Sequence, residues 1–164
     1  MAAIKPQKIM PHLWYAKEAE EAAKFYASIF PDSRVDRVTP LPADSPSGPA
    51  GSVKMVEFTL CGQQFLAISA GPLDPFNHAI SFVVSCDDQA EVDRYWDGLL
   101  QGGGATEACG WLKDRYGVSW QIVPRALFTM MADPDRAKAK RATDAMLKMV
   151  KLDLPTLQAA FDGK

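Results

Sequence analysis

The chain repeats one order of predicted elements, and this repeat restricts its possible folds more than any other feature of the sequence. A first strand within residues 8–16 precedes a predicted helix over 17–30, where alanine and aromatic residues recur at helical spacing. The other strands of this first copy are expected within 34–41, 53–60 and 63–69. The second copy has a strand at 78–86, a helix at 87–100, and strands within 105–108, 110–114 and 118–123.

The two copies also align with each other in sequence. Phe25-Tyr26 of the first predicted helix aligns with Tyr95-Trp96 of the second, and the closing strands align as residues 62–65 with 117–120. Each copy alone is a small curved sheet with one helix, which buries little core. Pairing the copies lets their sheets form one cupped surface, a natural ligand site. The sequence therefore predicts an α+β fold in which two β-α-β-β-β modules form a cupped mixed sheet.

We expect the paired modules to occupy residues 1–126, as about 7–70 and 77–125, and a C-terminal helical arm to occupy 127–164. The main helix of this arm is expected to begin with Asp133 as N-cap and Pro134 at the first helical position.

The predicted arm is amphipathic. One side has the apolar residues Ala142, Ala145, Met146, Met149 and Val150, and the other has the basic residues Arg136, Lys138, Lys140, Arg141 and Lys148. Such a helix suits a membrane surface or nucleic acid, or it packs on its own protein with a solvated basic face. The acidic character of the whole chain favours packing. We expect Met146, Met149 and Leu157 to seal a subunit or domain contact.

Composition excludes several classes of function. The formal net charge is −2 and the pI is about 5.7, which gives no general attraction to nucleic acid or to anionic membranes. The first residues carry no apolar core with a cleavage site, and no stretch approaches the ~18 apolar residues of a membrane span. We therefore expect a cytoplasmic protein that binds neither nucleic acid nor membrane. The cysteines, Cys61, Cys86 and Cys109, form no metal-binding or disulfide pattern and are expected to be buried, reduced thiols.

The repeat, the segment "AEEAAKFYASIFPDSRV" and the segment "GWLKDRYGVSWQIVP" resemble one group of proteins, the PhnB-like branch of the vicinal-oxygen-chelate superfamily. Glyoxalase I, extradiol dioxygenases, and fosfomycin and bleomycin resistance proteins are related to this branch. The resemblance extends into the arm and implies the glyoxalase/bleomycin-resistance fold and a homodimer. Apolar rims and sheet edges give the physical motive for such a dimer.

Members of this branch often carry the label 3-demethylubiquinone-9 3-methyltransferase. A doubly wound methyltransferase needs a glycine-rich turn directly after its first strand, where the backbone approaches the cofactor. The glycine cluster at 102–104 instead follows a predicted helix and reads as a helix stop. The residues therefore give the methyltransferase label little support.

The resemblance also implies positions for a metal site. Relatives take their ligands from the first and last strands of each module, which correspond here to His12, His78, Leu66 and Gln121. Two imidazoles and a carboxylate are a familiar set for a divalent metal ion, but Gln121 replaces the carboxylate and Leu66 supplies no donor. The alternative is that each histidine lies at the end of a strand and hydrogen-bonds to the backbone or to water. No cofactor other than this divalent metal ion is implied.

Aromatic residues complete the candidate site. Trp14 and Phe82, with Tyr15, Trp111 and Trp120, either line a pocket for a small organic ligand or belong to the core. Residues 113–117 predict a hairpin turn. Three functions stay open: small-molecule binding without metal in a cup lined by His12, Trp14, His78, Phe82 and Gln121; a metal-dependent lyase, isomerase or dioxygenase using His12, His78 and Gln121; and the methyltransferase of the label. Whether the chain turns over a substrate also stays open.

Overall fold

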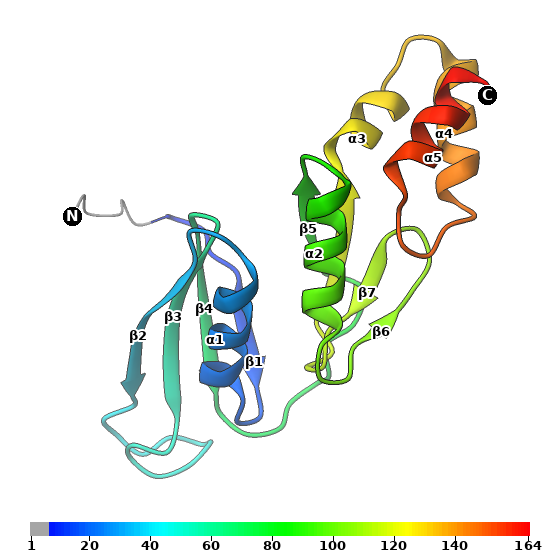
Figure 1. Cartoon of the computed structure of the whole chain (residues 1–164). Helices are drawn as coiled ribbons and strands as arrows, with labels where there is room; N and C mark the ends of the chain where they lie inside the picture. The colour runs from blue at the N-terminus through cyan, green and yellow to red at the C-terminus, as the bar shows by residue number, and fades with distance from the viewer. Residues whose placement is uncertain (1–6) are drawn as a thin grey trace. The chain divides into compact units, whose positions relative to one another are not determined.

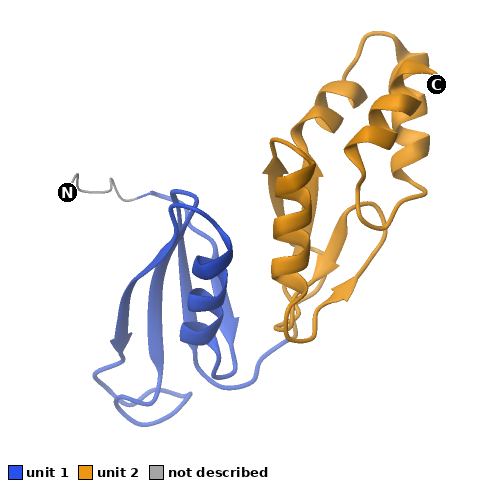
Figure 2. Cartoon of the chain, in the orientation of Figure 1, with its two compact units in different colours: residues 1–74 blue, residues 75–164 orange. Residues whose placement is uncertain are grey.

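The computed structural model describes residues 7–164, and the chain divides into two compact units, Met1–Asp74 and Pro75–Lys164 (Figure 2). Residues 1–6, which belong to the stretch where no targeting signal is expected, lie outside the described residues. Each unit contains one four-stranded mixed sheet with a helix packed against it (Figure 1). The repeated α+β module predicted from the sequence is thereby confirmed.

The first unit follows the predicted order of elements. Its elements are β1 (His12–Tyr15), α1 (Ala19–Ile29), β2 (Arg34–Pro40), β3 (Lys54–Leu60) and β4 (Gln63–Ser69). The strands lie in the order β1-β4-β3-β2, with β1 parallel to β4 and the other neighbours antiparallel. The tight turn between β3 and β4 consists of Cys61 and Gly62, whose φ angles of 47° and 80° are those of a primed hairpin turn.

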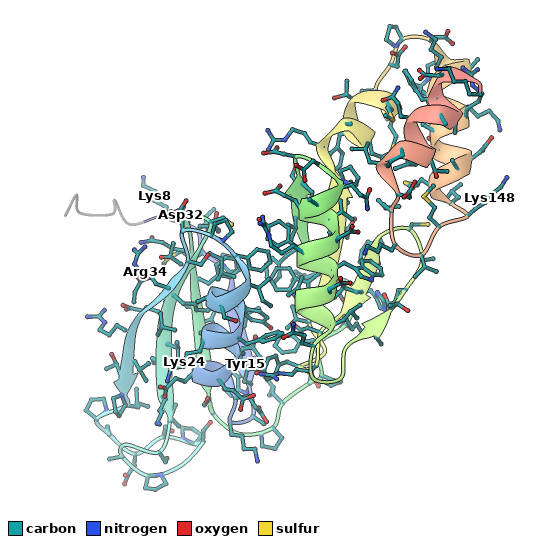
Figure 3. The ribbon with its side chains drawn as sticks, in the orientation of Figure 1. Lys8, Tyr15, Lys24, Asp32, Arg34 and Lys148 are labelled. Carbon is teal, nitrogen blue, oxygen red and sulfur yellow. The ribbon has the colours of Figure 1, made fainter. Side chains whose placement is uncertain are left out.

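Helix α1 forms because small and aromatic residues recur on one of its faces. Ala19, Ala22, Ala23 and Tyr26 are all buried. The Tyr26 ring stacks on Phe58 of β3, and its hydroxyl lies 3.1 Å from that of Tyr15. Tyr15 is labelled in Figure 3. The alanines let the helix backbone approach the sheet closely, and the aromatic rings supply most of the buried apolar area.

The second unit repeats this arrangement. Its first elements are β5 (Phe82–Cys86), α2 (Gln89–Leu100), β6 (Ala105–Thr106), β7 (Trp111–Lys113) and β8 (Ser119–Pro124). The strand order β5-β8-β7-β6 matches that of the first unit, with β5 parallel to β8. A variant capping box begins α2: Asp88 accepts from the Glu91 backbone N–H at 2.9 Å, and the Glu91 carboxylate accepts from the Asp87 N–H at 2.8 Å.

The predicted strand at 78–86 is too long. Strand β5 begins at Phe82, and residues 78–80 form a turn and bend in which Ile80 is 74% exposed. The partner strand explains the difference, because Phe82 pairs with Trp120 and β8 itself begins at Ser119. Residues before Ser81 therefore have almost no neighbouring strand to bond with. His78 consequently lies in a turn and not in a strand.

The C-terminal helices belong to the second unit. They are α3 (Arg125–Met131), α4 (Arg136–Met146) and α5 (Leu154–Asp162), which Figure 1 shows grouped at one end of that unit. Helix α3 was not expected from the sequence. The N-cap of α4 is Asp135, which accepts from the N–H groups of Ala137 and Lys138, so the prediction of Asp133 as the cap was wrong.

One apolar cluster holds these helices to β8. Its buried members are Val123, Leu127, Met130, Ala142, Leu152 and Leu157, with Met146 and Met149 packed against them. Of the stripe predicted for α4 and the residues after it, Val150 is the exception, because it is 51% exposed. The C-terminal helices therefore pack on their own unit, which is the alternative that the acidic character of the whole chain favoured.

The segment between α4 and α5 is also bound to the sheet by its backbone. The Gly110 N–H donates to the Val150 carbonyl at 2.8 Å, and the Leu154 N–H donates to the Gln89 side-chain oxygen at 2.7 Å. A Cβ at Gly110, where φ is +82°, would lie 2.9 Å from both the Ile122 carbonyl oxygen and Leu152. Glycine is therefore required where this segment crosses the start of β7.

No helix in the described part of the chain has the length and apolar character that a bilayer crossing requires. The cysteines differ from the expectation in one respect, because Cys61 is exposed while Cys109 is half-buried and Cys86 is buried. All three are free thiols.

We expect Ellman's reagent at pH 8 to label Cys61 quickly and Cys86 only after unfolding. Burial, followed by the charges of Glu91, Asp87 and Asp88, raises the pKa of the Cys86 thiol to about 12. Only about 10⁻⁴ of that thiol is ionised at pH 8, and the thiolate is the reacting form. A Cys61→Ser variant should lose the fast phase, and a fast phase that persists in it would contradict this assignment.

Candidate functional site

Each sheet has one face against its helix and an opposite face, called here the open face. Along β1 the side chains alternate, so that Leu13 and Tyr15 are buried beneath α1 while His12 is exposed and Trp14 is half-buried. His12 and Trp14 therefore share the open face of the first sheet. The Trp14 indole N–H donates to the Gly71 carbonyl at 2.9 Å, which fixes that ring.

A hollow of about 380 Å³ lies in the first unit. It is lined by Met10, Asp36, Glu57, Phe58, Gln64, Phe65 and Leu66. Leu66 is the direct ladder partner of His12, so the hollow begins next to the imidazole predicted as a ligand. Its volume falls in the range of small-molecule sites.

The carboxylates at this hollow already have cationic partners. Arg34 contacts Asp36 at 2.7 Å, and the Arg37 Nε donates to Glu57 at 2.8 Å. The Glu57 hydrogen bond raises the pKa of Arg37. The Thr59 hydroxyl donates to Asp36 at 2.6 Å. With its acidic groups paired and Met10 and Leu66 present, the hollow suits an uncharged or weakly polar organic molecule better than a free cation.

In the second unit, His78 has an ionic partner that sequence reasoning missed. Its Nε2 lies 3.2 Å from the Glu107 carboxylate, and its ring lies 5.9 Å from that of Trp111 at an interplanar angle of 43°. Lys113 Nζ lies 3.7 Å from the same Glu107 oxygen. Backbone bonding places Glu107 here, because its N–H donates to the Trp111 carbonyl at 2.9 Å. His78 is thus held by a turn, a carboxylate and an indole.

Gln121 is bonded elsewhere. Its side-chain amide donates to the Ser81 hydroxyl at 2.8 Å, and its ladder partners are Val83 of β5 and Trp111 of β7. In the first unit the residue paired with Leu66 is His12, so Val83 holds the equivalent position in the second unit. Sequence alignment had assigned that position to His78.

Phe82 faces the other way. It pairs with Trp120, which is 3% exposed, and the two rings lie 5.3 Å apart. Neighbours in a ladder point to the same side of a sheet, so Phe82 lies on the face covered by α2. This ring packs against a buried indole, and the expectation that Phe82 lines a ligand site stays a prediction.

The donors do not fit a metal ion within either unit. The first sheet offers the imidazole of His12 beside the apolar Leu66, and in the second unit His78 and Gln121 bond to Glu107 and Ser81. Among residues 7–164 no group of three or more His, Cys, Asp or Glu side chains is arranged to hold a metal.

The functional candidates missed from the sequence are Ser81 and Glu107. Both fall within segments predicted as strands, 78–86 and 105–108, but the structure places each just outside a strand, so an alternating pattern did not mark them as site residues. One signal was available in the sequence. Trp111 and Lys113 alternate along a strand and so lie on one face, which made a polar residue just before that strand, such as Glu107, a candidate for the same site.

Comparisons with known proteins agree with this fold. A family model described as 3-demethylubiquinone-9 3-methyltransferase matches residues 7–123, which end within β8, so the C-terminal helices lie outside the match. No curated protein matches the chain.

Three solved structures are informative. A PhnB protein from Bacillus cereus that carries the same methyltransferase label is 34% identical, with 72% of this chain and 99% of that chain covered and a TM-score of 0.62. Protein PA1353 from Pseudomonas aeruginosa is 21% identical, with 71% and 96% covered and a TM-score of 0.54. The fosfomycin resistance protein FosX from Mesorhizobium loti is 13% identical, with 78% and 100% covered and a TM-score of 0.53. The last two show likeness of fold alone.

Proposed function

The chain belongs to the 3-demethylubiquinone-9 3-methyltransferase family, in the PhnB-like branch of the vicinal-oxygen-chelate superfamily, and from this premise we propose that it binds a small organic molecule without a resident metal ion. The proposed site is the hollow on the open face of the first sheet. The molecule has an apolar body that contacts Leu66 and Met10. It carries no net charge, because the carboxylates at the wall are paired with arginines.

The observation that carries this proposal is the pairing of His12 with Leu66. A metal-dependent relative needs a donor at the Leu66 position, and a leucine there turns the same place into an apolar contact. Binding by shape and apolar contact, with a few polar groups for orientation, is the usual mode of a concave site of this volume.

The methyltransferase in the family description finds little support in the described residues. Gly102, Gly103 and Gly104 follow α2 and precede β6, so they end a helix and do not open one after a strand. Titration with S-adenosylmethionine tests the point directly, and we expect no heat of binding. Saturable binding of this compound at one site per chain would favour the family label instead.

The proposal is tested with the neutral fluorescent probe N-phenyl-1-naphthylamine. We expect saturable binding to the full chain and at least tenfold weaker binding to Leu66→Arg, because the longer charged side chain fills the hollow. Met10 lies outside the strands, so Met10→Arg is a second variant for the case in which Leu66→Arg misfolds. It should weaken binding of the probe by a similar factor.

The matched control is Leu147→Arg, since Leu147 is 60% exposed in the second unit. It should leave the affinity within twofold of the parent. Equal affinity in all variants, with native circular dichroism, would remove the hollow as the site. Stoichiometric uptake of added Mn²⁺ that is lost in His78→Ala would favour the metal-dependent alternative that uses His12, His78 and Gln121.

A further inference from the structure

We propose that the open face of the second sheet binds a planar ring bearing an ionisable hydroxyl group, a phenol or an enol, with Trp111 as the platform and His78 as the acceptor of the hydroxyl hydrogen. The inference goes beyond the proposed function, because it assigns a separate ligand site with its own class of ligand. It concerns residues of the second unit alone.

The first step is the state of His78. Its Nε2 lies 3.2 Å from a carboxylate oxygen of Glu107, so in the neutral imidazole the N–H is at Nε2 and donates to Glu107. The other ring nitrogen, Nδ1, then carries the lone pair and can accept a hydrogen bond. Glu107 therefore fixes both the tautomer and the ring orientation, as a carboxylate does behind many functional histidines.

The second step is the charge balance around this pair. Lys113 Nζ lies 3.7 Å from the same Glu107 oxygen, so the carboxylate is neutralised and does not repel an incoming hydroxyl or its anion. The side chains of His78, Glu107 and Lys113 are 51%, 26% and 34% exposed, so the group is reachable from solvent.

The third step is the platform. Trp111 is half-buried in β7, and its ladder partner Gln121 pairs in turn with Val83 of β5. Ladder partners point to the same side, so these residues form a row across three strands on the open face. Val83 is 51% exposed, and Gln121 is fixed by its bond to Ser81. An indole beside an apolar side chain and an amide suits a flat ring with a polar edge.

These features select a hydroxylated ring over other ligands. An aliphatic molecule would gain little from the indole. A ring without a hydroxyl would stack on Trp111 but leave His78 Nδ1 without a hydrogen-bond donor. No bond is made or broken in this step: the hydroxyl donates a hydrogen bond to Nδ1, and Nε2–H continues to donate to Glu107.

The test compares 4-methoxyphenol with 1,4-dimethoxybenzene, which has the same ring and no hydroxyl. Each is titrated into the ¹⁵N-labelled full chain, and the indole N–H signal of Trp111 is followed by NMR. We expect 4-methoxyphenol to shift this signal saturably and to bind at least tenfold more tightly than the dimethoxy compound. In His78→Ala the phenol should lose about tenfold in affinity, while the dimethoxy compound changes less than twofold.

Leu147→Arg is again the control, since Leu147 is 60% exposed in the same unit and belongs to neither proposed site. It should leave the affinity for 4-methoxyphenol within twofold of the parent. Glu107→Gln keeps an acceptor beside Nε2 and covers the case in which His78→Ala alters the turn; it should weaken the phenol selectively, by at least threefold. Equal losses for both compounds in these variants would reduce His78 to a packing residue and overturn the inference.

The outcome is separable from that of the proposed function. N-phenyl-1-naphthylamine has no hydroxyl and reports on Leu66, whereas the phenol reports on Trp111. Binding of the naphthylamine with no shift of the Trp111 signal would overturn only the present inference. Failure of both probes to bind would overturn both.

Discussion

A chain that ends after Ala132 should lose the folded second unit, and not only its C-terminal helices. The deleted residues include Leu152 and Leu157, which are 1% and 0% exposed and cover Leu127 and Met130 in one apolar cluster. Each buried leucine contributes about 1.5–3 kcal/mol. The combined loss, with the Ala142, Met146 and Met149 contacts, approaches the ~5–15 kcal/mol that stabilises a typical domain.

NMR of the truncated chain measures this result. Signals from the second unit should collapse to the narrow range of an unfolded chain, while signals from α1 and β3 of the first unit should be retained. Deletion of Lys164 alone is the control and should change neither set. A truncated chain that keeps the dispersed signals of β7 and β8 would show that the arm is dispensable. The sequence predicted that Met146, Met149 and Leu157 seal a contact; the structure places this contact within the second unit.

Asp114→Ala should destabilise the second unit by about 3 kcal/mol, because one buried carboxylate satisfies several donors. Asp114 is 3% exposed and accepts from the backbone N–H groups of Tyr116 and Val118 at 2.8 and 3.1 Å. It also accepts from the Trp120 indole N–H at 2.9 Å. The alanine variant leaves these donors without their acceptor in a place that water does not reach.

Urea unfolding monitored by circular dichroism gives the free energy of unfolding for this comparison. Asp74→Ala is the matched control, because Asp74 is exposed in the segment before β5 and should change stability by less than about 0.5 kcal/mol. Asp114→Asn keeps one acceptor oxygen and should fall between the two. A loss below about 1 kcal/mol for Asp114→Ala would contradict the role given to this carboxylate.

The position of Asp114 also shows what the sequence could and could not predict. Residues 113–117 were correctly predicted to form a hairpin turn, from the aspartate and glycine alone. The burial of that aspartate could not be predicted, because its indole partner lies across the hairpin. Local turn chemistry is readable from composition, whereas burial depends on which side chain folds over the turn.

The repeat was predictable because it depends on local patterns and not on a partner that lies far along the chain. Helical spacing in 19–29 and 89–100 and alternation in the closing strands are local patterns that appear twice. The strand at 78–86 was overextended because an apolar run does not reveal where its partner strand begins. Helix α3 was missed because it follows Pro124 of β8 directly, with no loop to separate strand from helix. Of two aspartates flanking Pro134, the sequence could not tell which caps α4.

The sheet face of each candidate residue was predictable only where alternation is clear. His12 and Trp14 share the open face of the first sheet as their spacing implies, whereas the Phe82 ring lies against Trp120, which an apolar run does not reveal. Glu107 could not be foreseen as a partner of His78, because their contact joins a turn to a loop far along the chain. Which of the predicted residues meet a common ligand stays a prediction.

The parallel pairing of β1 with β4 has a consequence for synthesis on the ribosome. Strand β1, which contains His12, is translated early. Its partner β4, which contains Leu66, is the last strand of the unit to be translated. At a translation rate of about 5–20 residues per second, the nascent β1 remains without its partner strand for roughly 3–10 s. During that interval Leu13 and Tyr15 are exposed to solvent as an unpaired apolar strand, so this short segment is where a ribosome-bound chaperone has most to protect.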